Sequence, residues 1–148
     1  MVETGNWLTP QFDYGVPFWG KPPLSTWLRA ISFELFGINE FAARLPSWLI
    51  ALGIAFLTFR LGRREKGEEV AWIATTLLTT TVLFYLLAGA VLMDPLLTLG
   101  TTLSMLAFWR AMRGDGRRWG YLVFVGLAIG LLAKGPVTIV LTGLPLFL

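Results

Sequence analysis

Long apolar segments, separated by short groups of charged residues, make up most of the chain. Residues 70–109 contain a single charged residue, Asp94, in 40 positions. A helix rises 1.5 Å per residue, so this segment forms about 60 Å of helix, roughly twice the thickness of the hydrocarbon core of a bilayer. The pattern therefore predicts two membrane crossings that turn near Asp94 and Pro95.

The same pattern predicts further helices on either side of this hairpin. We expect membrane helices over residues 39–61, 70–87, 95–111 and 119–133, and an incomplete helix over 135–148. Gly126 and Gly130 indicate close helix packing, and a threonine-rich run at 75–81 is expected to bond to helix carbonyls. The expected fold class is all-α, a polytopic transmembrane helical bundle.

Residues 1–38 follow a different pattern and form a separate region before the bundle of residues 39–148. Residues 1–23 are rich in Gly, Pro and aromatic residues, which is typical of a loop. Apolar residues then recur at helical spacing between 24 and 35, with Ser25, Arg29 and Ser32 on the other side. This predicts an amphipathic helix that lies flat in the membrane interface. It either packs on the bundle surface or forms one wall of a site between lipid and water.

The composition agrees with a membrane protein. The chain has 148 residues, of which 55% are hydrophobic and 14% charged, whereas soluble domains carry roughly a quarter charged residues. Such a chain is too apolar for a soluble domain or a disordered segment. Cysteine and histidine are absent, which excludes disulfides, zinc sites of the Cys/His type, a histidine base and a cysteine nucleophile.

The positions of the charges predict the orientation in the membrane. Eight of the 12 basic residues fall in two clusters, at 60–66 and 110–118, which two crossings separate. The clusters thus share one side, and the positive-inside rule makes that side cytoplasmic. Residues 1–38, Asp94 and Lys134 then lie on the outer, periplasmic side of the cytoplasmic (inner) membrane. The net charge of +3 therefore reflects topology, and we expect no nucleic-acid partner.

The two ends of the chain indicate a piece of a longer membrane protein. The chain opens without a basic and apolar signal segment, although residues 1–38 are expected on the outer side, and the last apolar stretch is only 14 residues long. The alternative interpretation is a small complete protein with an unusual start.

Several short motifs occur in an order and spacing that resembles a known family. They are ETGNWLTP at 3–10, VPFWGKPPL at 16–24, ARLPS at 43–47, MDPL at 93–96 and AKGP at 133–136. Together they resemble bacterial polyprenyl-phosphate-dependent glycosyltransferases, a group that includes protein O-mannosyltransferase-like enzymes and the aminoarabinose transferase of lipid A. The resemblance covers essentially the whole chain.

This resemblance implies a fold, a reaction and partners. The implied fold is the C-type glycosyltransferase fold, with the active site on the outer side of the membrane. The implied donor is a sugar on a polyprenyl phosphate, and the acceptor, whether lipid, glycan or protein, stays open. The family's expected catalytic base is an Asp in a loop that would precede Met1, so the catalytic residue is not expected in this chain.

The resemblance also implies roles for two lysines. Lys21 and Lys134 would bind the phosphate of the lipid donor, whose departing negative charge a cation stabilises. Each has a simpler interpretation: Lys21 can bind headgroups of membrane lipids, and Lys134 can end a helix together with Gly135 and Pro136.

Asp94 and Arg44 are weaker candidates for orienting the substrate. Asp94 before Pro95 fits an N-cap followed by proline at the first helical position. Arg44, at the outer start of a helix, fits an anchor or one partner of an ion pair. Some relatives place a Glu before the Lys of Lys-Pro, in a position associated with a metal, but Gly20 stands there in this chain. No metal ligands are therefore evident.

Two other functions are compatible with the pattern: a segment of a transporter or lipid flippase, and a non-catalytic membrane protein. Transporters usually place ionisable groups near the membrane midplane on broken helices. Here Lys21, Asp94 and Lys134 are expected near the outer ends of helices, which favours chemistry at the membrane surface.

Overall fold

The computed structural model describes residues 5, 7, 11–13, 15–17, 22–90 and 93–147. These residues form seven helices and one short antiparallel pair of strands, β1 (Gln11–Asp13) and β2 (Val16–Pro17). The helices are α1 (Leu24–Phe36), α2 (Glu40–Lys66), α3 (Glu68–Thr80), α4 (Val82–Gly89), α5 (Asp94–Met112), α6 (Arg117–Lys134) and α7 (Val137–Phe147). The all-α prediction is confirmed, with the strand pair as an addition in the predicted loop.

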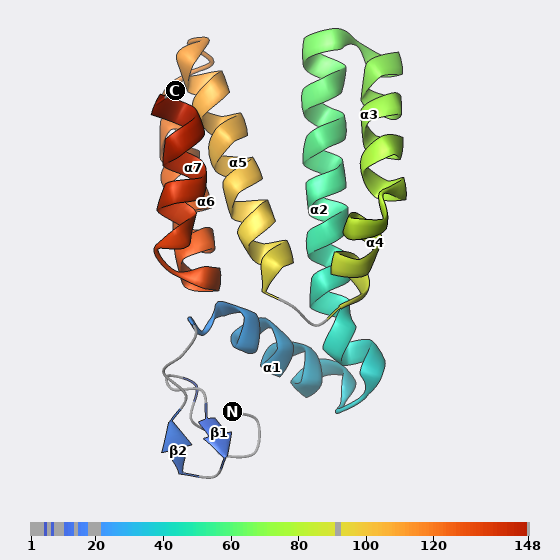
Figure 1. The fold of residues 1–148 in the computed structure, drawn as a ribbon, viewed down its shortest axis with the longest axis vertical. Helices are drawn as coiled ribbons and strands as arrows, with labels where there is room; N and C mark the ends of the chain where they lie inside the picture. Colours follow the sequence, from blue (N-terminus) through green and yellow to red (C-terminus); the bar gives the residue numbers. More distant parts are fainter. Residues whose placement is uncertain are drawn as a thin grey trace.

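The helices form two groups that stand side by side (Figure 1). One group contains α2, α3 and α4, and the other contains α5, α6 and α7. Helix α1 lies across the lower ends of both groups, where α4 ends, α5 begins and the α6–α7 turn is found. We call this the α1 end. The turns from α2 to α3 and from α5 to α6, with both basic clusters, lie at the opposite end, which we call the basic end.

Helix α2 begins and ends where local chemistry dictates. The side chain of Asn39 accepts a hydrogen bond from the backbone N–H of Ala42 (2.8 Å), which caps the first turn. The helix ends at Lys66 because Gly67 has φ 96°, a conformation that other residues adopt rarely. The helix extends five residues beyond the predicted end at residue 61. The first basic cluster is thus part of the helix.

The prediction of one helix over 70–87 is wrong. The structure has α3 and α4, bent by 65° at a break centred on Thr81. The hydroxyls of Thr79, Thr80 and Thr81 donate to backbone carbonyls one turn earlier, at 2.7–2.9 Å. Such bonds compete with the helical ladder and bend helices. The threonine run is therefore the local cause of the break, and its expected bonding to carbonyls is confirmed at these three positions.

Helices α5 and α6 pack closely through small residues, as Gly126 and Gly130 indicated. A Cβ atom added to Gly126 would lie 2.6 Å from the backbone oxygen of Gly100, and one added to Gly100 would lie 2.8 Å from the backbone nitrogen of Gly130. The hydroxyl of Ser104 donates to the carbonyl of Val123 across the same interface (3.1 Å). The two backbones can approach this closely only because glycine has no side chain.

The outer surface of the bundle is strongly apolar. Large exposed side chains include Leu52 and Phe56 on α2, Leu83 and Tyr85 on α4, and Phe124 on α6. By length and apolar character, α2 qualifies as a membrane span among the described helices, and the bent α3–α4 pair qualifies as a second if it is one span. Helices α5 and α6 carry charged residues at both ends.

Candidate functional site at the α1 end

An ion pair between Asp94 and Lys134 joins two helices at the α1 end. Asp94 is the first residue of α5 and Lys134 is the last residue of α6, and they are 40 residues apart in the chain. The ammonium group of Lys134 donates a hydrogen bond to Oδ1 of Asp94. Both charges also suit their helix ends, because the helix dipole favours an anion at an N-terminus and a cation at a C-terminus.

The role of Asp94 in its own helix differs from the predicted one. Met93 occupies the N-cap position of α5, without a side-chain cap bond, and Asp94 is already helical. The N-cap interpretation of Asp94 is therefore wrong, because its carboxylate is directed to Lys134 instead. Pro95 stands near the start of the helix, as expected.

The geometry leaves Lys134 able to bind a second anion. The side chains of Lys134 and Asp94 are 46% and 37% exposed, so the pair is accessible and contributes only about 0–1 kcal/mol to folding. A lysine ammonium has three N–H donors, and Asp94 uses one of them. The remaining donors can bind oxygens of a phosphate.

The structure gives different outcomes for the other two predicted site residues, Lys21 and Arg44. Lys21 lies outside the described residues; its neighbour Pro22 is near the end of α6, because a Cβ atom added to Gly135 would lie 4.0 Å from Cγ of Pro22. Arg44 is bonded to Glu40, one turn earlier on α2 (2.5 Å), and this is its only ion pair among the residues that the structure describes. The structure thus brings Asp94 and Lys134 together and pairs Arg44 separately.

Helix α1 covers this end with its small polar residues turned inward. Ser25, Ala30 and Ser32 are buried, whereas Ile31 and Leu35 are 46% and 71% exposed. The hydroxyl of Ser32 donates to the carbonyl of Ala42 (2.6 Å), which attaches α1 to α2. An apolar outer face and a polar inner face are the reverse of a helix on a soluble protein, and they fit a helix in contact with lipid.

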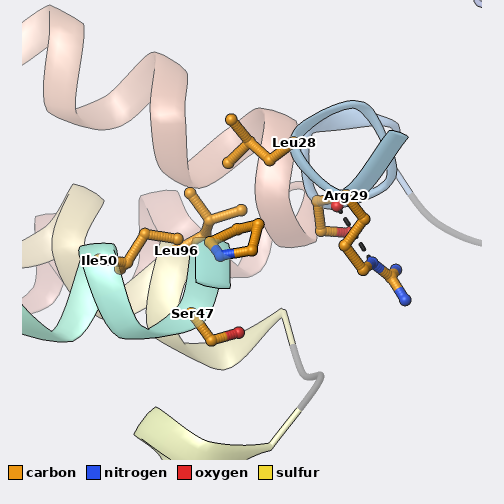
Figure 2. Close-up of a pocket in the computed structure, with 7 residues that line it drawn as sticks. Leu28, Arg29, Ser47, Ile50 and Leu96 are labelled. Atoms are coloured by element: carbon orange, nitrogen blue, oxygen red, sulfur yellow. Dashed lines mark hydrogen bonds between the residues drawn. The ribbon is translucent and has the colours of Figure 1, made fainter. Parts of the chain in front are cut away.

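A small pocket lies between α1, α2 and the first turn of α5 (Figure 2). Its lining consists of Ser25, Leu28, Arg29, Pro46, Ser47, Ile50 and Leu96. The space inside is about 10 Å³, which is about the room that one water molecule needs. The hydroxyl of Ser25 is buried here and has no hydrogen-bond partner among the described residues.

Arg29 is a residue that the sequence analysis placed on a helix face without giving it a role. Its Nε donates to the carbonyl of Ser25 (3.2 Å; dashed in Figure 2), and its guanidinium points away from Ile50 and Leu96. Burial lowers the pKa of Arg29, although an arginine stays charged at neutral pH. The polar spacing of Ser25, Arg29 and Ser32 is the sequence signal that indicates this inward face.

Metal ligands are not evident in this region. The described residues contain no group of three or more His, Cys, Asp or Glu side chains that could hold a metal ion.

Comparison with known structures defines the class of protein. Two crystal structures of ArnT from Cupriavidus metallidurans, one in the apo state and one bound to undecaprenyl phosphate, match the chain with a TM-score of 0.92 and 25% identity. The match covers 99% of this chain and 28% of theirs. The chain thus has the fold of part of a C-type membrane glycosyltransferase, as the family resemblance implied.

Sequence comparison gives the family. The family model for dolichyl-phosphate-mannose-protein mannosyltransferase matches residues 1–148, and the chain belongs to this family. Curated relatives include the undecaprenyl phosphate-alpha-4-amino-4-deoxy-L-arabinose arabinosyl transferases of Shewanella sediminis and Edwardsiella ictaluri. The Shewanella sediminis relative is 33% identical over 139 residues, which cover 91% of this chain. The Edwardsiella ictaluri relative is 33% identical over 135 residues, which cover 88% of this chain. The chain spans about a quarter of the length of these relatives (25% and 24%).

Proposed function

We propose that this chain contributes the donor-phosphate site of a membrane glycosyltransferase. The enzyme would transfer a sugar from a polyprenyl-phosphate donor to an acceptor on the outer side of the cytoplasmic membrane. The observation that carries the proposal is the accessible Lys134, held by Asp94 at the end of the bundle that α1 covers. The names of the relatives and the undecaprenyl phosphate in one matched structure support this donor class.

The proposed mechanism assigns charge stabilisation to the lysines. An acceptor nucleophile attacks the anomeric carbon of the sugar, the bond to the phosphate oxygen breaks, and the polyprenyl phosphate leaves with its negative charge. Lys134 donates hydrogen bonds to the leaving phosphate, and Lys21 supplies a second cation. Such charge-assisted bonds are most useful where negative charge develops in the transition state.

Asp94 acts through Lys134 and is a positioning residue. Its bond to the ammonium group fixes the end of a flexible four-carbon side chain, so less conformational entropy is lost when a phosphate binds. No residue among those described is assigned as the base. The family resemblance would give that role to an Asp outside residues 1–148.

The placement of the charges disfavours a transporter or a flippase. Asp94 and Lys134 stand at the first and last positions of their helices, whereas transporter sites usually lie near the midplane on broken helices. The broken pair α3–α4 carries charged residues only at Glu68 and Glu69, in the first turn of α3 at the basic end.

A binding measurement with the chain itself tests this site. The 148-residue chain is placed in nanodiscs of phosphatidylcholine, and the binding of undecaprenyl phosphate is titrated. K134A is expected to weaken binding about ten-fold or more, because a charge-assisted hydrogen bond contributes about 1.5–3 kcal/mol. R44A is the matched control, since it removes one positive charge at the same end from a residue that is paired with Glu40. Equal affinities of K134A and the unaltered chain would overturn the role of Lys134.

A chimera tests the reaction separately. The 148 residues replace the corresponding quarter of the Shewanella sediminis relative, and sugar transfer from the lipid donor is measured. We expect transfer by the chimera and a loss of at least ten-fold in its K134A variant. Undiminished transfer by the variant would contradict the proposal. A chimera that moves the lipid across the bilayer without transferring sugar would favour the flippase alternative.

A further inference from the structure

The charges of the chain are distributed unequally between the two ends of the bundle. The two turns at the basic end and their flanking residues carry eight cations and four anions within 60–69 and 110–118. This end therefore has a net charge of +4, while the rest of the chain, with four cations and five anions, has a net charge of −1. The excess of positive charge belongs entirely to one end.

Three of the eight cations have structural partners, and two of these three join the two turns. Arg64 on α2 pairs with Asp115 in the α5–α6 turn (2.8 Å), and Arg113 in that turn pairs with Glu65 on α2 (2.5 Å). Arg110 is buried, with its guanidinium 4.2 Å from the ring centre of Trp119. Each turn thus contributes one cation and one anion to the two ion pairs that join the turns. The three arginines therefore have structural roles.

Four other cations have no such role. Arg60, Lys66, Arg117 and Arg118 are exposed and make no ion pair with any residue that the structure describes. We call these four residues the basic face. Arg117 and Arg118 stand in the first turn of α6, where a cation opposes the helix dipole. The stability of α6 therefore does not explain their position.

We propose that the basic face binds the phosphate headgroups of anionic phospholipids. Trp109 and Tyr121, 46% and 70% exposed, lie close to the basic face in the chain, and such aromatic residues concentrate at the headgroup level of a bilayer. Cations at that depth attract anionic lipids, and arginine suits phosphate because its planar group donates in pairs. This inference is independent of the proposed function, which concerns the opposite end of the molecule.

Lipid selectivity measures this interaction directly. The chain is reconstituted in phosphatidylcholine bilayers that contain a trace of spin-labelled phosphatidylglycerol or spin-labelled phosphatidylcholine, and the fraction of each lipid held at the protein surface is compared. We expect a clear preference for phosphatidylglycerol. The variant R117Q/R118Q should reduce this preference by about five-fold for each arginine, which corresponds to about 1 kcal/mol per cation near the surface.

Two controls separate this interaction from simpler effects. R117K/R118K keeps both charges and should keep most of the preference, whereas R29Q/R44Q removes the same charge from the opposite end and should leave it unchanged. Inorganic phosphate in the buffer distinguishes a lipid surface from a site for free phosphate. Loss of the preference on addition of phosphate, at constant ionic strength, would replace the lipid with the free anion as the ligand. Equal selectivity of R117Q/R118Q and the unaltered chain would overturn the proposal.

Discussion

The two groups of helices are packed in different ways. In the group of α5, α6 and α7, small residues bring the backbones together along the interface, and Gly100, Gly126 and Gly130 leave no room for a Cβ atom. Eight residues of α5 are buried. In the group of α2, α3 and α4, close contact is concentrated where Gly62 meets Ala71. Of the described residues of α4, none is buried.

The kink at Thr81 explains the difference. Beyond it, α4 diverges by 65° from the direction of α3, and an apolar groove of about 250 Å³ opens between α2 and the α3–α4 pair. The groove is lined by Trp48, Ala51, Leu52, Ala55, Thr79, Phe84 and Ala88. Apolar side chains gain little from each other in lipid, so packing depends on how closely two backbones can approach. In the group of α5, α6 and α7, glycine lets the backbones approach closely. In the group of α2, α3 and α4, the bend at Thr81 ends the close packing of α3 along α2.

The largest expected effect comes from adding one methyl group at the glycine interface. In G126A the new Cβ would lie 2.3 Å from the hydroxyl of Ser104 and 2.7 Å from its backbone nitrogen, so α5 and α6 must separate. We expect a loss of about 3 kcal/mol or more, measured by unfolding in detergent. G120A on the same helix is the control, because no described atom lies within 4 Å of its Cβ. A gain of up to about 1 kcal/mol is expected there from helix propensity. Similar stabilities of the two variants would contradict this account of the interface.

A smaller loss is expected at the single close contact of the other group. In G62A the new Cβ would lie 2.9 Å from the Cα and 3.3 Å from the Cβ of Ala71. We expect a loss of about 1–2 kcal/mol, because α3 can shift slightly toward its exposed side. The unfolding measurement is the same as for G126A. A loss equal to that of G126A would show that both groups are packed with the same tightness.

The smallest effect is expected in the groove. A88L places a larger apolar side chain in existing space beside Phe84, so we expect a change within about 1 kcal/mol and no loss of helix content. Circular dichroism measures the helix content, and thermal unfolding measures the change in stability. A loss of several kcal/mol would mean that the groove is a close-packed interface.

The sequence predicted the helices and the two ends of the bundle well, for a physical reason. Charged residues are costly in a hydrocarbon environment and so collect at helix ends, and this gave the joint position of Asp94 and Lys134 and that of the basic clusters. The kink was missed because periodicity does not report hydrogen bonds such as those of Thr80 and Thr81.

The candidate site was only partly predictable. Lys134 and Asp94 were both identified, but their pairing depends on the register of α5 against α6, which Gly100 and Gly126 set. The two residues are 40 positions apart in the chain. Their pairing therefore depends on how the helices pack in space, which the local sequence pattern does not report. Arg29 received no role because the spacing identifies its helix face as polar but does not show which face of the helix the protein covers.

The reciprocal ion pairs at the basic end have a consequence for how the protein is made. The α2–α3 turn is synthesised first, and at that moment Arg64 and Glu65 lack Asp115 and Arg113, with which they pair in the finished fold. The partners arrive only when α5 and the following turn have left the ribosome and stand on the same side of the membrane. An inverted second hairpin leaves four charges unmatched. The two pairs therefore form only in a chain whose two turns lie on the same side of the membrane.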